Sequence, residues 1–474
     1  MLYETINPAT GQVVQTFPTI TDIELETALA TADDCFRNDW RHRPVADRAR
    51  IVSRAAAIMR DNADEYARYI VEDMGKLLGV ALVEVNLAAS ILDYYAKNAE
   101  TFLQPKQFPG FPGAALVARP TGAILAIEPW NFPYYQVARV AGPQLMAGNV
   151  LLLKHAESVP QCALAFERAL REAGAPDGAY TNIFANHEQI GRFIADPRIA
   201  GVTLTGSERA GAAVAEQAGR HLKKVVMELG GSDALIVLPD APLDHAVSSA
   251  LSGRMFNCGQ SCVASKRIIV VGKERGAAFT EKFVAAAKAL KVGDPTDAST
   301  ELPPLSSERA LTGLLSQVEK ARAAGAKILT GGKRVNRPGF FIEPTVLAGI
   351  DEKNPAYREE LFGPVASIYV VDNEEDAIRI ANDTPYGLGG SVFGADLKHA
   401  RRVADRIETG MVYINQPAWV AADLPFGGVK NSGFGREQSE LGFGEFINHK
   451  LINVAPAGAP GWGPVDLEAV QAAE

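Results

Sequence analysis

The chain has little cysteine: four residues in 474, none in a Cys-x-x-Cys or Cys/His spacing suited to zinc. So few cysteines exclude a disulfide scaffold and favour a reducing compartment, which predicts a cytoplasmic location and no bound metal. Met1–Pro8 lacks a basic segment followed by an apolar run, so no signal peptide is expected. No apolar run approaches the roughly 20 residues that cross a membrane, so no membrane segment is expected.

Basic residues are in the minority, with 47 Lys and Arg against 56 Asp and Glu and a net charge of -9 at pH 7. This balance disfavours a nucleic-acid partner, because the phosphate backbone would be repelled. The length and the 47% of hydrophobic residues are sufficient for two or three domains.

Short apolar strands alternate with amphipathic helices along most of the chain. After helices at 22–36 and 45–74, strands are predicted at 121–128, 148–154, 181–184, 201–205 and 224–228, with helices between most of them. The alternation restarts near Gly230 and continues to about Asn415, which predicts two α/β units with parallel sheets. Phe108–Ala118 and Phe446–Val454 fit neither unit, and such sheet edges often pair with a neighbouring subunit.

Phe256–Cys262 offers a candidate nucleophile. A helix is predicted to end here in a glycine-containing turn that carries Cys262. A cysteine becomes nucleophilic where a partly exposed, electropositive setting favours its thiolate, whereas an isolated cysteine is more often a small buried hydrophobe. The buried role suits Cys258 better.

Glu228 and Asn131 are candidates for the other groups that thioester chemistry needs. Glu228 ends a predicted strand before Gly230 and Gly231, where a carboxylate could activate water, although alone it is equally an ordinary solvated glutamate. Asn131 lies where a strand passes into a helix. Its amide, together with the Cys262 backbone N–H, could stabilise an oxyanion.

The helix that follows Asn131 predicts a substrate-facing surface. Phe132, Gln136 and Arg139 fall at i, i+4 and i+7 and therefore share one face. That face could line a tunnel with Arg139 at its far end, while a surface salt bridge is an equally good interpretation of Arg139.

A dinucleotide site is indicated by 202–211, which reads as a strand, a Gly206–Ser207 turn and a helix. Such a turn can place a pyrophosphate at a helix N-terminus, although it is not the GxGxxG fingerprint. Lys154 and Glu157 follow another strand and could bind the adenosine ribose, or could simply be a solvated charged pair. A carboxylate at Glu157 would repel a 2′-phosphate, which predicts NAD, with NADP less favoured.

Together and in this order, these segments resemble the aldehyde dehydrogenase superfamily. The resemblance runs from Asn7–Gly11 to Phe446 and includes the separation of glutamate and cysteine (262 − 228 = 34). It implies that Cys262 is the nucleophile, Glu228 the base for thioester hydrolysis and Asn131 the oxyanion donor. The cofactor contacts it implies are Trp130, Lys154, Glu157, Gly206, Ser207, Leu229, Glu360 and Phe362.

The fold implied by the resemblance is α/β. A Rossmann-like NAD-binding domain would comprise 1–107 and 124–228, and an α/β catalytic domain 229–424. A return segment at 425–446 would rejoin the cofactor domain, and 108–123 with 447–456 would form a small β oligomerisation arm. Family members are dimers or tetramers, so a homodimer or homotetramer is expected.

Within the superfamily the chain looks most like short bacterial succinate-semialdehyde dehydrogenases, in which an arginine matching Arg139 holds the distal carboxylate. Two departures favour a more apolar pocket: Val420 replaces a serine of many relatives, and Phe256 replaces an arginine of several, with Arg254 two residues earlier. Trp419 could narrow the pocket further. A broad-specificity enzyme for aliphatic or aromatic aldehydes is therefore the alternative.

The presence of Glu228 and Cys262 argues against two other classes of protein. A CoA-acylating dehydrogenase would not need a base such as Glu228, because its acyl group leaves to CoA and not to water. A non-catalytic protein on the same fold would be suggested by loss of either residue, and both are present.

Overall fold

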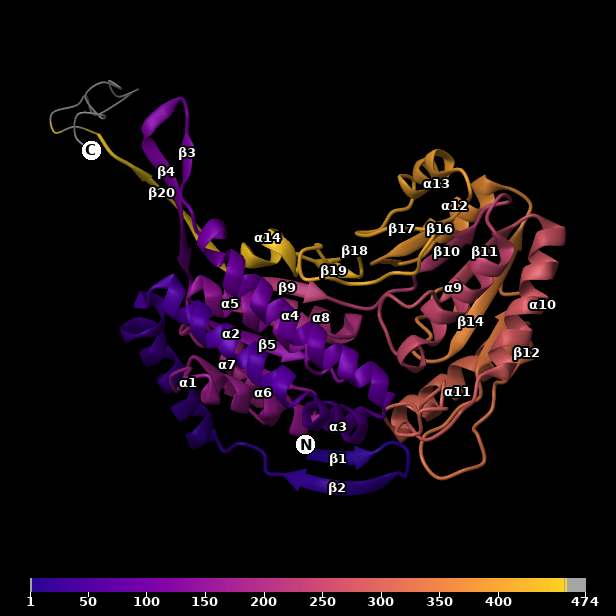
Figure 1. Cartoon of the computed structure of the whole chain (residues 1–474), viewed down its shortest axis with the longest axis horizontal. Coiled ribbons are helices and arrows are strands. Elements are labelled where there is room, and N and C mark those ends of the chain that lie inside the picture. The colour runs from indigo at the N-terminus through magenta and orange to yellow at the C-terminus, as the bar shows by residue number, and fades with distance from the viewer. Residues whose placement is uncertain (1, 456, 458–474) are drawn as a thin grey trace.

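Two α/β units, each with its own sheet and hydrophobic core, form the body of the computed structural model, which describes residues 2–455 and 457 (Figure 1). The expected α/β fold is confirmed. The first sheet has the order β19-β9-β8-β5-β6-β7, parallel except for β19. Its strands are β19 (Gly433–Phe434), β9 (Lys224–Glu228), β8 (Ile199–Thr205), β5 (Ala123–Glu128), β6 (Val150–His155) and β7 (Tyr180–Asn182).

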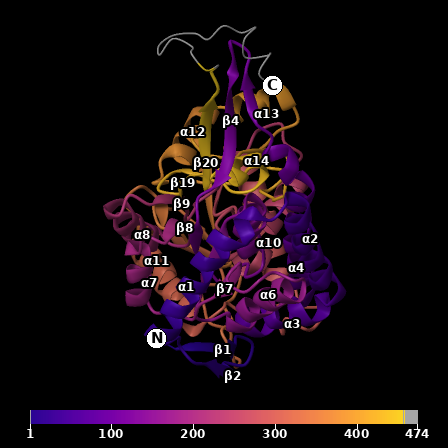
Figure 2. The ribbon, with the colours of Figure 1, turned by 90° about the vertical axis from the view of Figure 1, so that its left-hand side faces the viewer.

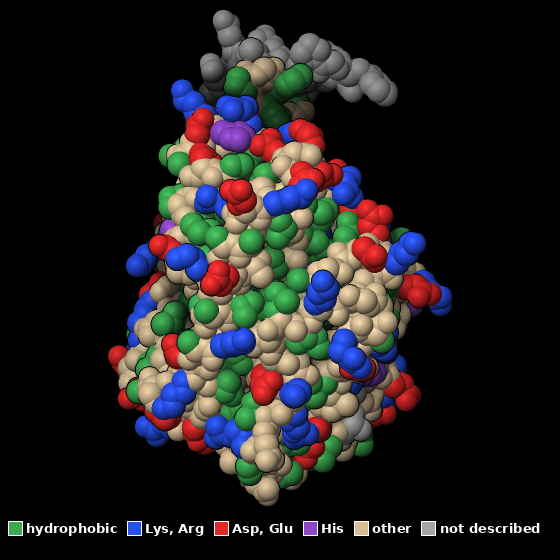
Figure 3. All heavy atoms as spheres, turned by 90° about the vertical axis from the view of Figure 1, so that its right-hand side faces the viewer, with side chains coloured by type: hydrophobic (Ala, Val, Ile, Leu, Met, Phe, Trp, Pro, Cys, Tyr) green, Lys and Arg blue, Asp and Glu red, His purple; other side chains and the backbone are tan. Residues whose placement is uncertain are grey.

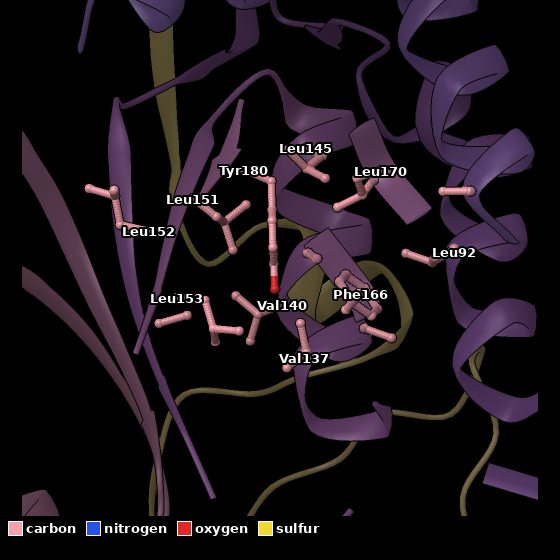
Figure 4. Close-up of a cluster of buried hydrophobic side chains, with 14 of the residues drawn as sticks. Leu92, Val137, Val140, Leu145, Leu151, Leu152, Leu153, Phe166, Leu170 and Tyr180 are labelled. Atoms are coloured by element: carbon pink, nitrogen blue, oxygen red, sulfur yellow. The ribbon is translucent and has the colours of Figure 1, made fainter. Parts of the chain in front are cut away.

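Helices lie on both sides of this sheet (Figure 1). They are α1 (Asp22–Asn38), α2 (Val45–Asp61), α3 (Ala63–Met74), α4 (Leu78–Phe102), α5 (Tyr135–Ala147), α6 (Pro160–Glu172), α7 (His187–Ala195) and α8 (Glu208–Arg220). The hairpin of β1 (Tyr3–Asn7) and β2 (Gln12–Phe17) precedes them. The centre of the first core, drawn in Figure 4, packs Leu151–Leu153 of β6 against Val137 and Val140 of α5 and Phe166 of α6. A strand buried on both faces is apolar throughout, which explains the continuous apolar run of β6.

The helix predicted at 45–74 is two helices, because Asn62 closes α2 and begins α3 with non-helical angles (φ −114°, ψ 26°). Helix α4 was not predicted. Its 25 residues include a stretch that is apolar enough, and the helix is long enough, to cross a membrane by composition and length alone. It nevertheless packs against α2, α3 and α5 inside the first unit, as a core helix does.

The second sheet has the order β12-β13-β14-β11-β10-β16-β17, parallel except for β12. Its strands are β12 (Lys327–Thr330), β13 (Thr345–Ala348), β14 (Val365–Val371), β11 (Arg267–Val271), β10 (Ala234–Val237), β16 (Gly390–Phe393) and β17 (Tyr413–Ile414). The helices of this unit are α9 (Leu243–Met255), α10 (Lys273–Ala289), α11 (Glu308–Ala323), α12 (Glu374–Asn382) and α13 (Leu397–Ala404). Figure 3 shows acidic and basic side chains interspersed over the outer face of this unit, as on an ordinary solvated surface.

A three-stranded arm projects from the first unit (Figures 1 and 2). It consists of β3 (Lys106–Phe108), β4 (Phe111–Pro120) and β20 (Ile447–Asn453), with β20 antiparallel to β4. Before β20 the chain returns to the first unit, where β19 pairs with β9 and is followed by α14 (Ser439–Phe443). Residue 456, the last of the predicted arm, lies outside the described residues.

Candidate active site

Cys262 is carried by a strained turn after α9. Asn257, Cys258 and Gly259 have consecutive positive φ angles of 53°, 55° and 70°. Each non-glycine residue in this region costs on the order of 1–2 kcal/mol, so the surrounding contacts must hold the turn. A Cβ on Gly259 would lie 2.3 Å from the Gly363 carbonyl oxygen, so only glycine permits this close approach.

Asn131 lies directly against this turn, although it comes from the junction of β5 and α5. Its Nδ2 donates to the Gln260 carbonyl (3.1 Å), and its own carbonyl accepts from Asn257 Nδ2 (3.0 Å) and Lys76 Nζ (2.9 Å). Gln136 Nε2 donates to the Asn131 side-chain oxygen (3.4 Å). The structure thus brings the predicted oxyanion donor and the predicted nucleophile together.

A buried ion pair of Lys76 and Glu84 supports the same junction and was missed by the sequence analysis. Glu84 Oε1 accepts from the backbone N–H groups of Tyr134 (2.9 Å) and Tyr135 (3.2 Å) at the start of α5. Lys76 Nζ also lies 3.8 Å from the centre of the Phe132 ring. The available signal was a glutamate among the apolar residues of the first turns of α4, because such residues are rarely buried unless paired.

One cavity of about 350 Å³ opens on one side of Cys262. Its walls are largely apolar and include Phe132, Gln136, Phe256, Trp419, Val420 and Phe426. Trp419 and Phe256 are 47% and 45% exposed and lie at its rim. The residues predicted to make the pocket apolar therefore do line it.

Arg139 does not line this cavity in the structure, although the sequence analysis expected it at the far end of a substrate tunnel. Its Nε lies 2.7 Å from Glu437 Oε2, and both side chains are buried. Its Nη2 donates to Thr205 Oγ1 (3.2 Å), and the guanidinium lies between the rings of Tyr135 and Phe426. Because the guanidinium is already paired and lies behind the cavity wall, it is not available to a substrate carboxylate in this structure.

A second cavity, of about 270 Å³, opens on the other side of Cys262. The predicted cofactor residues that line it are Trp130, Gly206, Ser207, Leu229, Glu360 and Phe362. Cys262 and Gln136 line both cavities, so the thiol stands at their junction. A reactant in one cavity and a second molecule in the other would meet at this sulfur.

Glu360 and Phe362 are fixed from the second unit. Glu360 Oε1 accepts from the Gly231 N–H (3.1 Å) and pairs with Lys266 Nζ (3.0 Å). Lys266 Nζ also donates to the Cys262 carbonyl (2.7 Å), and Phe362 packs edge-on against Trp130. Lys266, another residue that sequence reasoning missed, thus links Cys262 to the Glu360 segment.

Lys154 and Glu157 form an ion pair at the carboxyl end of β6. Burial opposes ionisation of Glu157, but the charge of Lys154 and its hydrogen bond hold the pKa of Glu157 below its usual value. Neither residue lines the second cavity described above. Ser207 caps α8 by accepting from the Ala210 N–H (3.3 Å).

Glu228 ends β9 but lines neither cavity. Its carboxylate is buried without a hydrogen-bond partner among the described residues, in a cluster with Glu128, Glu437 and Arg139. Burial first, and then the charge of Glu437, raises the pKa of Glu228 well above its usual range, while Arg139 opposes the shift. In this conformation burial therefore favours the protonated form of the Glu228 side chain.

Burial raises the pKa of Cys262 to about 12, against the opposing charges of Lys266 and Arg139. The resting side chain is therefore a thiol. Cys258 is fully buried and donates to the Pro303 carbonyl, 3.1 Å away. This contact fits the structural role predicted for it.

Comparison with known proteins identifies the family to which this chain belongs. The sequence profile of the aldehyde dehydrogenase family matches residues 1–452. A Deinococcus radiodurans protein named succinate-semialdehyde dehydrogenase (NADP(+)) is 51% identical over 96% of this chain and 95% of its own. A Mycobacterium tuberculosis protein named succinate-semialdehyde dehydrogenase (NADP(+)) 1 is 46% identical over 95% of this chain and 99% of its own. The crystal structure of succinic semialdehyde dehydrogenase from Streptococcus pyogenes in complex with NADP+ superposes with a TM-score of 0.93, at 45% identity over 95% of this chain and 99% of that one.

These relatives overturn the predicted preference for NAD. Both curated relatives are named for NADP(+), and the Streptococcus pyogenes enzyme is in complex with NADP+. The prediction treated Glu157 as a free carboxylate, whereas its charge is paired with Lys154 in the structure. The matched profile and the high identity over nearly the whole length show that the chain belongs to the aldehyde dehydrogenase family and is an oxidoreductase that acts on aldehydes.

Proposed function

We propose that this chain oxidises succinic semialdehyde to succinate with NADP, through a thioester on Cys262. The observation that carries the proposal is the position of Cys262 at the junction of the two cavities. Substrate and cofactor are taken from the names of the relatives, which are 46% to 51% identical to this chain.

The residues of the second cavity fit a dinucleotide. The N-terminus of α8 at Ser207 suits a pyrophosphate, and the Trp130 and Phe362 rings suit a nicotinamide. Lys154 lies outside this cavity, in β6, and its ammonium suits a 2′-phosphate. Gly206, Leu229 and Glu360 complete the proposed set, with Glu157 near the ribose. When bound, the cofactor supplies the acceptor for the hydride of the aldehyde carbon.

The protein groups supply the remaining chemistry. The Cys262 thiol passes its proton to water, and the thiolate adds to the aldehyde carbon. The Asn131 amide with the Cys262 N–H stabilises the resulting oxyanion. After oxidation the acyl group is held as a thioester. Glu228, once it turns out of its buried cluster and is ionised, takes a proton from the water that cleaves this thioester.

The proposal also assigns a role to each part of the chain. Residues 1–107 and 124–228 bind the cofactor, 229–424 carry the nucleophile, and 425–446 return to the first unit. The arm of 108–123 and 447–455 joins subunits in a homodimer or homotetramer. The four cysteines, all free thiols, support a cytoplasmic location.

A second candidate is a general dehydrogenase for aliphatic or aromatic aldehydes. It is favoured by one observation: no lysine or arginine is among the described residues that line the 350 Å³ cavity. Phe132, Gln136, Trp419 and Val420 would then select an apolar chain, with Arg139 kept behind the wall.

The deciding experiment compares kcat/KM with NADP for succinic semialdehyde, glutaric semialdehyde, hexanal and benzaldehyde. A preference for succinic semialdehyde over hexanal of about tenfold, or about 1.4 kcal/mol, supports the first proposal. A flat or reversed ranking favours the second. Cys262→Ala should abolish NADPH formation with every aldehyde, and turnover in that variant would overturn the mechanism itself.

A further inference from the structure

Arg254 is a fully buried cation near the end of α9 with no carboxylate in contact among the described residues. Its guanidinium instead donates to backbone carbonyls: Nε to Val365 (2.7 Å), Nη2 to Leu361 (2.7 Å) and to Gly363, and Nη1 to Gly259 (3.3 Å). Burial lowers its pKa to about 10, so it stays protonated at neutral pH. A buried charge without an opposite charge is costly unless hydrogen bonds compensate it.

The carbonyls that Arg254 binds belong to two segments, one next to the second cavity and one in the turn before Cys262. Glu360 and Phe362 line the proposed nicotinamide side of the second cavity. The carbonyls of Leu361, Gly363 and Val365 belong to the same short segment of chain. Gly259 belongs to the turn that carries Cys262. The two segments approach so closely that a Cβ on Gly259 would lie 2.3 Å from the Gly363 carbonyl oxygen.

We propose that Arg254 is a positioning residue for hydride transfer: it fixes the spacing between the nucleophile turn and the Glu360–Phe362 segment. Arg254 lines neither of the two cavities that meet at Cys262, so it acts through the two backbones that it joins. The planar guanidinium presents five donors in a fixed fork, which suits carbonyls spread over two segments, whereas a lysine ammonium is a compact point of charge. The inference rests on the proposed function only in that a nicotinamide cofactor occupies the second cavity.

The test is Arg254→Lys, which keeps the charge and removes the fork. Two activities are compared: NADPH formation with a normal and a 1-deuterated aldehyde, and release of p-nitrophenolate from p-nitrophenyl acetate without cofactor. The ester acylates Cys262 without a hydride step. We expect kcat for oxidation to fall about tenfold or more, with a larger deuterium isotope effect and a higher KM for NADP, and ester hydrolysis to stay within roughly threefold.

The matched control is Arg48→Lys. Arg48 is also buried and also donates to backbone carbonyls, those of Met146 and Arg43, but it lies on α2. Below its melting temperature this variant should keep both activities within roughly threefold. Equal losses of oxidation and ester hydrolysis in Arg254→Lys, or an unchanged rate of oxidation, would overturn the proposal.

If Arg254→Lys does not fold, Gly363→Ala tests the same spacing from the other side. Its new Cβ would lie 2.2 Å from a Leu314 methyl group and would displace the segment while leaving Arg254 intact. The same selective loss of oxidation is expected, and an equal loss of both activities refutes the inference. The assay uses whichever aldehyde the unmodified enzyme oxidises. An error in the proposed substrate would therefore appear in the substrate comparison above and would not affect the test of Arg254.

Discussion

Arg139 and Glu437 form an ion pair whose side chains are only 0% and 5% exposed. Burial raises the pKa of Glu437 even though Arg139 opposes that shift, so the carboxylate depends on its partner. Removing one partner of a buried pair typically costs about 3–5 kcal/mol, because the other charge stays buried alone.

Arg139→Met is therefore expected to lower the melting temperature strongly while leaving substrate choice intact. The ratio of kcat/KM for succinic semialdehyde and hexanal should stay within roughly threefold of its original value. Arg139→Met combined with Glu437→Leu should regain much of the lost stability. A selective rise of KM for succinic semialdehyde would instead show that Arg139 reaches the substrate in a conformation other than the one described.

Glu157→Ser is expected to raise kcat/KM with NADP by about tenfold, since it removes a negative charge near a 2′-phosphate and frees Lys154 to bind it. Glu157→Gln, which keeps the size of the side chain, is the matched control and should show most of the same gain. Initial rates over a range of NADP concentrations measure both. If neither substitution changes the NADP kinetics, the Lys154–Glu157 pair lies away from the phosphate.

At the scale of elements, β6 supports the Asn131 junction through its last residue, His155. The buried ring contacts the carbonyls of Glu128 (3.1 Å) and Pro133 (2.9 Å), on either side of Asn131. Burial lowers the pKa of His155 to about 4. Because the unfolded chain takes up this proton near pH 6.5, the stability contributed by the neutral ring is complete above pH 6.5 and is lost as the pH falls towards 4.

His155→Asn should consequently be less stable than the original chain at pH 7, by a margin that narrows on acidification. The linkage predicts that about 2 kcal/mol of the difference is gone at pH 5. Thermal unfolding of both proteins at pH 7, 6 and 5 measures it. Other buried acids are common to both chains and cancel in the comparison, so a constant gap would mean that His155 is not held neutral.

The elements also show what sequence patterns can and cannot predict. Strands such as β6 and β9 were predictable, because each is a short apolar run near a glycine: Gly148 precedes β6 and Gly230 follows β9. Helix α4 was not, because its apolar residues surround much of its circumference and leave no clear 3.6-residue stripe. Lys76 and Lys266 were missed because each also contacts a residue far along the chain, Asn131 at 55 positions and Glu360 at 94 (131 − 76 and 360 − 266). No local pattern records these contacts, although the Lys76–Glu84 pair spans only eight residues.

At the scale of the whole molecule, the arm is the part that we propose contacts another subunit. On it Phe111, Leu451 and Ile452 are 62%, 59% and 39% exposed, although they are apolar. Family members are typically oligomers, and exposed apolar strands of this kind are typical of subunit contacts.

Leu451→Glu combined with Ile452→Glu is expected to reduce the molar mass in solution to that of one chain, about 50.6 kDa. Light scattering after size exclusion measures the mass. Val13→Glu combined with Val14→Glu changes two similarly exposed residues of the β1–β2 hairpin and should leave the mass unchanged. An oligomer that survives the arm substitutions would place the main contact elsewhere.

The pairing of β19 with β9 has a consequence for biosynthesis. Gly433 pairs with Glu228 across 205 residues of chain (433 − 228), so β9 leaves the ribosome long before its neighbour exists. Until then the nascent first unit has an open edge, a feature that invites pairing with other chains. Glu228, the proposed base, lies on that edge. A translation product truncated before β19 would therefore contain Asn131, Glu228 and Cys262. It would lack Glu437 and also β19, which covers the buried acidic cluster in the complete chain.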